Sequence, residues 1–279
     1  MPYPAAPAQE AARPSFPDLL RSWRRRRRMS QLELALDSGV SQRHLSFLES
    51  GRAAPSRAMI LQLGETLQVP LRDRNDLLLA AGFAPVFRAR PLEDPQMAQV
   101  MSAVRMILRN HDPFPAIAVD RAWNVRLANG PFDRLVDLLG PDLWRRVGGA
   151  QRNVMRLFFH PDGIRPIVTN WSAIAHVLWQ RARRESEAVG GGELRVLLEE
   201  LARYQDPETL RAGEDAALLP VMPLTMEKDG LRVSVFTVIA TFGTPQDVTA
   251  DELRIETLFP ADADTEALLR SAGDGGSAA

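Results

Sequence analysis

Residues 31–50 read QLELALDSGVSQRHLSFLES, and this stretch decides the fold of the first part of the chain. Ser30 and Ser41 each precede a short segment with apolar residues at helical spacing, and serine is a favoured helix N-cap. Gly39 lies between the two segments, where a sharp turn needs a left-handed backbone conformation. The stretch therefore predicts two short helices joined by a tight turn.

The residue types in this pair match the helix-turn-helix template at several independent positions. Ala35 is small at the point where the second helix passes close to the first. The alternative is a helical hairpin with no role in DNA binding, and the agreement of turn, small residue and apolar set disfavours it. The interior positions are filled by Leu34, Val40, Leu45 and Leu48.

The second helix of the pair presents side chains that suit the major groove of DNA. Gln42 is a residue type that reads adenine, Arg43 one that reads guanine, and Ser46 one that bonds to bases or phosphates. His44 is expected to contact the groove or the backbone, since no second metal ligand lies at helical spacing. Gln31 begins the preceding helix, where amide groups and the helix dipole favour a phosphate.

Apolar periodicity and turn residues predict three further helices around this pair. One carries the stripe that begins at Phe16, a second runs from Ser56 or Arg57 to Leu67, and a third follows Pro70 and ends before Gly82. Some arginines of the run 24–28 are expected to touch phosphate, although five consecutive residues wrap the whole helix and a solvated helix end is the alternative. The first part is predicted to be an all-α domain of five helices.

The charge balance supports two parts with different partners. The formal net charge is −1, but residues 13–90 hold 14 Arg against 7 acidic residues, whereas residues 91–279 hold 20 basic and 27 acidic residues. A basic first part is the electrostatic signature of nucleic-acid binding. The chain has no cysteine, which excludes disulfides, thiol catalysis and zinc fingers.

The second part reads as an α+β domain. Residues 116–120 and 123–129 resemble two short strands, and residues 221–243 predict a hairpin around Asp229-Gly230. Helical patterns are expected at 97–110, 130–139, 141–147, 151–159, 166–187 and 193–204, and residues 249–259 carry a further short helix and strand signal. The predicted organisation is a disordered tail at 1–15, a DNA-binding domain at 16–82, a linker at 83–96, an α+β domain at 97–270 and a disordered tail at 271–279.

Several stretches of both parts resemble a known family. The run from Ser30 to Pro85 is similar to the DNA-binding domain of the xenobiotic-response-element class, in the form found in MmyB-like transcription regulators. The pieces PAIAVDRAWNVRLAN, RNVMRLFFHPDGIRPIVTNW and IATFGTPQDVTADELRIETLFPADADTEALL resemble the PAS-like ligand-binding domain of the same regulators. In that class the first residues of the recognition helix contact bases. The full set predicted to contact DNA is Gln31, Ser41, Gln42, Arg43, His44, Ser46 and Arg52.

The resemblance implies a small-molecule sensor that holds a fatty-acid-like ligand and regulates a nearby gene, often that of a short-chain dehydrogenase. Arg156 and Asn153 lie one turn apart and are candidate donors to an acidic head group, and Asn129 is a second polar candidate. Arg156 has an alternative reading as a structural partner of a core carboxylate such as Asp133 or Glu256. Phe132, Phe158, Trp171 and Phe236 are candidate apolar contacts, although such positions are more often ordinary core.

The sequence does not support an enzymatic function. The sequence contains no nucleophile elbow, phosphate-binding loop, dinucleotide fingerprint or H-E-x-x-H motif, so no catalytic residue, metal site or cofactor is predicted. No membrane span or signal peptide is visible, and a cytoplasmic protein is expected. The expected partners are double-stranded DNA with a two-fold symmetric operator, a second copy of the chain and a small apolar ligand. The rival reading is a repressor whose second domain is only a dimerisation scaffold.

Overall fold

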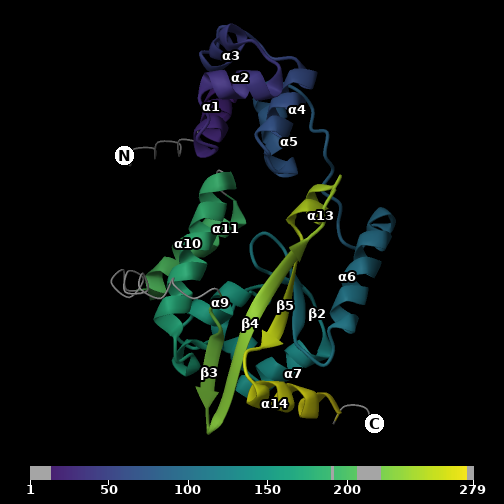
Figure 1. Ribbon diagram of the computed structural model, residues 1–279, viewed down its shortest axis with the longest axis vertical. Coiled ribbons are helices and arrows are strands. Elements are labelled where there is room, and N and C mark those ends of the chain that lie inside the picture. Colours follow the sequence, from purple (N-terminus) through teal and green to yellow (C-terminus); the bar gives the residue numbers. More distant parts are fainter. Residues whose placement is uncertain (1–13, 190–191, 206–220, 275–279) are drawn as a thin grey trace, which may run out of the picture. The chain divides into compact units, whose positions relative to one another are not determined.

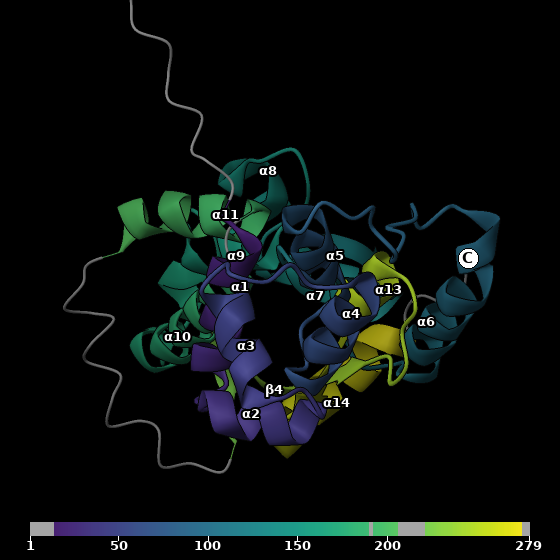
Figure 2. The same ribbon diagram turned by 90° about the horizontal axis from the view of Figure 1, so that it is seen from above.

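The computed structural model describes residues 14–189, 192–205 and 221–274, and these divide into two compact units after Arg88. The first unit is built from helices, as its sequence predicts (Figures 1 and 2). Its elements are α1 (Phe16–Arg26), α2 (Gln31–Ser38), α3 (Gln42–Glu49), α4 (Arg57–Thr66) and α5 (Leu71–Ala80).

Serine side chains start four of these helices. Ser15, Ser30, Ser41 and Ser56 each accept a hydrogen bond from a backbone amide in the first turn. At Ser30 the bond is reciprocal, because Glu33 accepts from the Ser30 amide at 2.6 Å and forms a capping box. These local signals explain why the helix starts could be predicted so closely. Beneath them lies one apolar core with almost no exposed area, which includes Leu20, Leu34, Leu45, Leu48, Ile60, Leu63, Leu67 and Leu78.

The segment expected as a linker, residues 83–96, is structured at both ends. Phe83 and Val86 pack against the first core, and Asn75 holds the backbone of Val86 and Phe87 through its side-chain oxygen. The other end begins a short 3-10 helix, η1 (Pro95–Met97). Proline content alone overstated the length of the linker, because proline also begins and ends packed segments.

The second unit is the α+β domain that the sequence predicts, with one antiparallel sheet. Its described strands are β1 (Ala116–Val119), β2 (Val125–Ala128), β3 (Leu224–Lys228), β4 (Leu231–Thr241) and β5 (Arg254–Pro260), in the spatial order β2-β1-β5-β4-β3. Asp229 and Gly230 both have positive φ at the β3–β4 turn, the geometry that an Asp-Gly hairpin turn requires. β5 is the central strand, and its Glu256 lies between Ile117 of β1 and Ile239 of β4.

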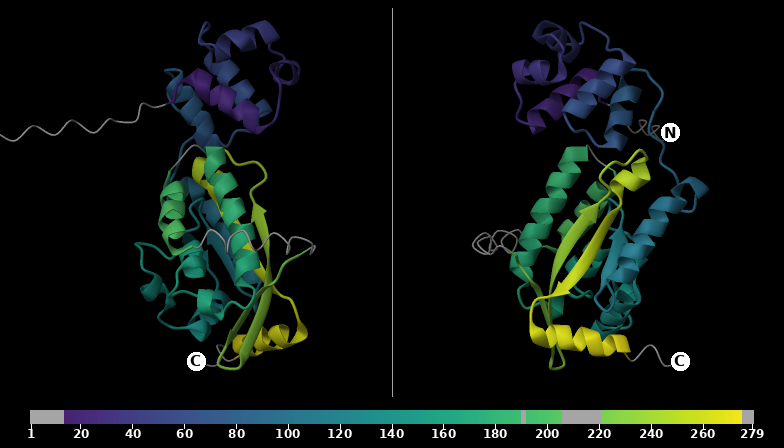
Figure 3. Two further views of the ribbon diagram at one scale, coloured as in Figure 1. Left: turned by 90° about the vertical axis from the view of Figure 1, so that its left-hand side faces the viewer. Right: turned by 45° about the vertical axis from the view of Figure 1, so that its right-hand side comes forward.

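Helices cover the two faces of this sheet unequally (Figure 3). One face is covered by α6 (Ala98–Asn110), whose Val104 and Leu108 pack on Ala116 and Ile255. Helices that lie between β2 and β3 in the sequence pack on the other face and form the larger core. The ones among the described residues are α7 (Gly130–Leu139), α8 (Leu143–Val147), α9 (Val154–Phe159), η2 (Arg165–Ile167), α10 (Trp171–Val189), α11 (Glu193–Leu201) and η3 (Ala202–Tyr204).

Two of the predicted boundaries are wrong. The helix expected at 166–187 is divided into η2 and α10, because Val168 is extended and forms an isolated bridge with Met226 of β3. After the short helix α13 (Val248–Glu252) and β5 comes α14 (Ala263–Asp274), which continues into the segment expected as a disordered tail.

Tertiary contacts anchor α14. Thr265 is fully buried and accepts a hydrogen bond from the Ser234 amide at 3.0 Å, and Leu269 belongs to the larger core. The expected tails at 1–13 and 275–279 lie outside the described residues.

Candidate functional site

The α2–α3 pair has the geometry of a helix-turn-helix. Gly39 ends α2 with φ of 69°, the left-handed conformation that the tight turn needs. Ala35, Leu45 and Leu48 are buried where the two helices meet, and Val40 packs against the same core. α3 is thereby fixed with one side in the core and the other in solvent.

The side of α3 that faces solvent carries most of the residues predicted to contact DNA. Ser41, Gln42 and Arg43 are exposed, while His44 and Ser46 are half-buried. Ser41 also caps α3, accepting from the His44 amide at 3.2 Å, and its O–H remains a donor. The structure thus leaves these side chains accessible to a nucleic acid.

Arg43 and Arg52 both lie against the ring of Phe47. The guanidinium carbons of Arg43 and Arg52 lie 5.5 and 5.3 Å from the centroid of the Phe47 ring. A cation at this distance from a ring face is attracted by the ring quadrupole. The two arginines, which come from α3 and from the loop after it, therefore share one platform on the exposed side of this unit.

A buried ionic cluster holds α1, α2 and α3 together. Glu49 is 2% exposed and receives two hydrogen bonds from Arg24 and a third, at 2.8 Å, from the side-chain Nε2 of Gln31. Burial alone would raise the pKa of Glu49, but the bonds from Arg24 and Gln31 outweigh it and lower the pKa below the usual value. Gln31 was expected at a phosphate, but its side-chain amide donates to Glu49 inside the domain.

The arginine run is divided between structural and exposed positions. Besides Arg24, Arg27 is engaged through hydrogen bonds to the backbone oxygens of Leu67 and Gln68, both at 2.7 Å. Arg25 and Arg28 are exposed at the end of α1. The expectation that only part of this run faces DNA is consistent with this arrangement.

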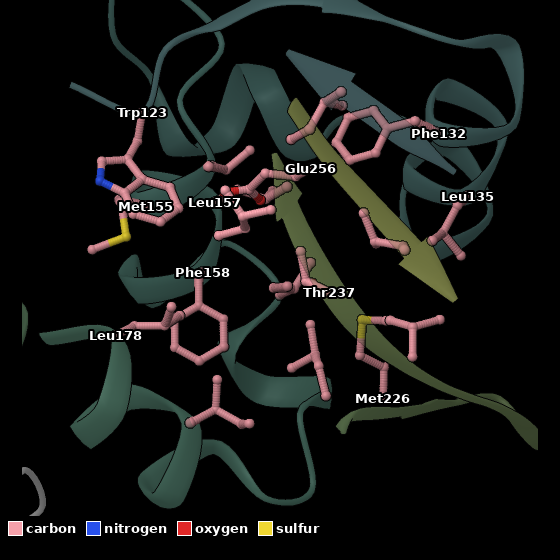
Figure 4. Close-up of a pocket in the computed structure, with 18 of the residues that line it drawn as sticks. Trp123, Phe132, Leu135, Met155, Leu157, Phe158, Leu178, Met226, Thr237 and Glu256 are labelled. Carbon is pink, nitrogen blue, oxygen red and sulfur yellow. The ribbon is translucent and has the colours of Figure 1, made fainter. Parts of the chain in front are cut away.

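The second unit contains an apolar cavity of about 360 Å³ on the inner face of the sheet (Figure 4). Helices α7, α9 and α10 form its walls, and strands β1, β3, β4 and β5 form its floor. Its apolar side chains include Phe132, Leu135, Met155, Phe158, Leu178 and Met226, and its polar atoms come from Arg181, Thr237, Glu256 and the ring nitrogen of Trp123.

Two of the four predicted apolar contacts line this cavity. Phe132 and Phe158 do so, and Phe158 is stacked at 6.1 Å on Trp171, which lies behind it and outside the lining. Phe236 also lies outside the lining. Side chains alternate along a strand, so Thr237 and Ile239 point into the cavity while Phe236 stacks on Phe259 on the opposite face.

The three predicted polar contacts are engaged elsewhere. Arg156 binds Glu200 through two hydrogen bonds of 2.8 and 2.7 Å, so it is a structural partner, but of a different carboxylate from those expected. That bond is the main reason why the pKa of Arg156 is raised. Asn153 caps α9 and donates to the Ala122 oxygen at 2.8 Å.

The side chain of Asn129 is likewise hydrogen-bonded to backbone groups. Its side-chain oxygen accepts from the amides of Ala116 and Phe132, and its nitrogen donates to the oxygens of Leu108 and Phe114. It caps α7 and ties that helix to β1 and α6. From sequence Asn129 was a candidate polar contact for the ligand, and the structure instead gives it this capping role.

Glu256 is the polar residue of the cavity that sequence reasoning treated only as a core carboxylate. It is buried, its Oε1 has no hydrogen-bond partner, and burial raises its pKa to about 7, against the attraction of Arg181 and Arg254. One signal in the sequence marks it. In RIETLFP it alternates with the inward-facing Leu258, so period-2 reasoning places a charge on the buried face.

A second ionic group borders this end of the cavity. Glu185 of α10 accepts from Arg181 at 2.9 Å and from Arg254 at 2.7 Å. Both guanidinium groups lie over the ring of Trp123, at 5.2 and 5.6 Å from its centroid. The Trp123 ring nitrogen is buried and has no hydrogen-bond partner.

The described residues also show what is absent. No group of three or more histidine, aspartate or glutamate side chains among them could hold a metal ion. No helix in the described ranges combines the length and the apolar character that crossing a membrane requires.

Two family models match the chain, one within each of its two units. Residues 20–73 match the model of a helix-turn-helix family, and residues 100–272 match the model of the MmyB-like transcription regulator ligand binding domain. No curated protein matches the chain. Among solved structures, an RNA-binding light-oxygen-voltage receptor matches at 14% identity, with 97% of this chain and 69% of that one covered, and a TM-score of 0.23. The ligand-binding match spans more than half of the sequence, and the chain belongs to the MmyB-like transcription regulators.

Proposed function

We propose that this regulator binds a two-fold symmetric operator as a homodimer in the cytoplasm, and that an apolar ligand with an acidic head group alters its affinity for that operator. Gln42 and Arg43 would read bases, while Ser41, His44, Ser46 and Arg52 would contact bases or backbone. One recognition helix reads only a half-site, so a dimer on a symmetric operator is the expected arrangement. No cofactor is required by this proposal.

The cavity is the observation that supports ligand sensing. Protein interiors rarely leave voids larger than a water molecule, whereas small-molecule sites begin at roughly 300 Å³. This cavity has about 360 Å³ and is lined largely by aliphatic and aromatic side chains. Among the described lining residues, polar atoms come from Arg181, Thr237, Glu256 and the ring nitrogen of Trp123, and this small number favours an elongated apolar ligand with one polar end.

In this proposal the dimer has two arrangements, which differ in the relative placement of its two DNA-binding domains. These two arrangements couple ligand binding to operator binding. A ligand shifts an equilibrium only when it binds the two states with different affinity. We expect the occupied cavity to favour one relative placement of the two DNA-binding domains. The operator would then be bound more tightly, or less tightly, when ligand is present.

Native mass spectrometry of the freshly purified chain tests the sensor against its rival, a ligand-free dimerisation scaffold. The proposal predicts a dimer whose mass exceeds that of two chains, with the excess lost under denaturing conditions. Isothermal titration with decanoate would be carried out in parallel on chain stripped of small molecules. A dimer with no excess mass that also fails to bind decanoate would support the scaffold and contradict the sensor.

A further inference from the structure

The polar end of the cavity holds a buried acid, Glu256, beside the cation Arg181. Glu256 projects from the central strand β5 into the apolar interior (Figure 4). It is buried, with 8% of its area exposed, and its Oε1 is without a hydrogen-bond partner. Buried polar groups are nearly always paired, so an unpaired carboxyl aimed into a cavity of ligand size indicates that the ligand completes the pairing.

The surroundings of Glu256 are apolar apart from one cluster of three charged side chains. The neighbouring strands place Ile117 and Ile239 beside it, and α9 contributes Leu157 to the same lining. α7 contributes apolar residues such as Phe132.

The charges that act on Glu256 come from α10 and from β5 itself. They are Arg181 and Glu185 on the helix and Arg254 on the strand. Both arginines bind Glu185, so two positive charges share one negative charge.

This charge count determines which ligand head group can be accommodated. With Glu256 protonated, Arg181, Arg254 and Glu185 leave one net positive charge, and an ionised carboxylate would neutralise it. With Glu256 ionised, the four side chains are already neutral, and a carboxylate would leave an uncompensated negative charge in an apolar cavity. Such a buried charge is strongly unfavourable.

We infer that Glu256 forms the head-group site of the cavity and that a carboxylate ligand binds together with one proton, which Glu256 takes up from solvent. The Glu256 O–H then donates to the ligand carboxylate, and Arg181, which lines the same cavity, supplies the compensating charge. The inference rests on the proposed ligand-sensing function and adds to it the residue, the head-group chemistry and the proton. Because the pKa of Glu256 lies at about 7, the proton is available at neutral pH and becomes scarce above it.

Isothermal titration of the full chain with decanoate and with decan-1-ol, between pH 6 and pH 9, tests the inference. Free decanoate has an ordinary carboxyl and is ionised throughout this range. Its affinity should fall about tenfold for each pH unit above neutrality, since binding requires a proton, while the affinity for the uncharged alcohol stays constant. Titrations at pH 8 in two buffers with different heats of ionisation should show uptake of about one proton per decanoate bound.

The variant Glu256→Gln provides the second arm. Glutamine cannot ionise and keeps an N–H donor, so decanoate affinity should lose its pH dependence and exceed that of the wild type at pH 8.5. Glu227→Gln makes the same chemical change at an exposed position on β3 and should keep the wild-type slope.

Three results would overturn the inference. A wild-type decanoate affinity that is constant from pH 6 to pH 9 would show that no proton is coupled to binding. A Glu256→Gln variant that keeps the wild-type slope would assign the proton to another group. If neither decanoate nor decan-1-ol binds at any pH, the ligand-sensing proposal falls and the inference falls with it, whereas a flat decanoate profile removes the inference alone.

Discussion

Arg24 and Glu49 are joined by two hydrogen bonds, from Nε to Oε1 at 2.6 Å and from Nη2 to Oε2 at 2.8 Å, and the pair links the first helix of the chain to the recognition helix. Arg21 donates to the backbone oxygen of the same Glu49. An arginine run that looks from sequence like a phosphate-binding surface thus contributes to holding the recognition helix in place.

Replacement of Arg24 by alanine should destabilise the first unit by about 3–5 kcal/mol, because it leaves the carboxylate of Glu49 buried without its main partner. Hydrogen exchange of the amides in α1–α3 of the full chain measures this loss as faster exchange. The adjacent Arg25 is exposed, and Arg25→Ala should change the free energy of unfolding by no more than about 0.5 kcal/mol. Equal exchange in the two variants would mean that the ionic pair contributes little.

Base reading should depend on the exposed residues at the start of α3. We expect Gln42→Ala or Arg43→Ala to reduce discrimination between operator and random DNA by about 1–3 kcal/mol per lost bidentate contact. Arg25→Ala, which removes at most a phosphate contact, should weaken binding to both DNAs alike. Fluorescence anisotropy with an operator selected by the full chain from a random library gives both affinities. A variant that keeps the wild-type ratio would exclude that residue from base reading.

A larger side chain in the cavity should block the ligand. Leu178 lines the cavity from α10, and Leu178→Trp would occupy space that an elongated ligand needs. Decanoate affinity should fall at least tenfold, while operator binding in the absence of ligand stays within a factor of about two. Leu138→Trp on the exposed side of α7 is the matched control, because Leu138 is 46% exposed and lies outside the lining. Unchanged decanoate affinity in the Leu178 variant would place the ligand elsewhere.

Glu256 should also make the stability of the second unit depend on pH. The carboxyl has a pKa of about 7 in the folded chain against 4.5 as its ordinary value, so the folded state binds more protons between these values. The free energy of unfolding therefore falls as pH rises from about 4.5 to 7, by roughly 3 kcal/mol in total, and then levels off.

Urea unfolding at several pH values measures this loss, as the difference in the free energy of unfolding between Glu256→Gln and the wild type. The stability of Glu256→Gln relative to the wild type should rise by roughly 3 kcal/mol over that window, whereas Glu227→Gln should follow the wild type. A constant difference between Glu256→Gln and the wild type would mean that Glu256 titrates normally.

The sequence allowed the first unit to be predicted almost residue by residue because its signals are local. Ser30 with Glu33 starts α2, and Gly39 ends it, all within ten residues. The positions of β1, β2 and the β3–β4 hairpin were predictable for the same reason, although β2 begins two residues later than expected because Trp123 has a positive φ. α14 was missed because its anchor, Thr265, depends on a contact with Ser234 that is distant in the sequence.

From sequence the cavity could be predicted to be apolar, but the residues that line it could not all be identified. Its floor joins strands that are more than a hundred residues apart, so which residue of each strand points inward depends on the register. The sequence therefore does not reveal that Thr237 lines the cavity while Phe236 stacks on Phe259 on the other face. Arg156 had two readings because its partner, Glu200, lies on a helix whose packing the sequence does not reveal.

The central claim is that ligand in the second unit controls DNA binding by the first, and operator affinity with and without decanoate tests it most directly. Anisotropy titrations at pH 6.5, where decanoate binding should be near its strongest, would compare the two Kd values for the selected operator. We predict at least a fivefold difference in wild type that disappears in Leu178→Trp. Equal Kd values with the cavity shown to be saturated would contradict the claim.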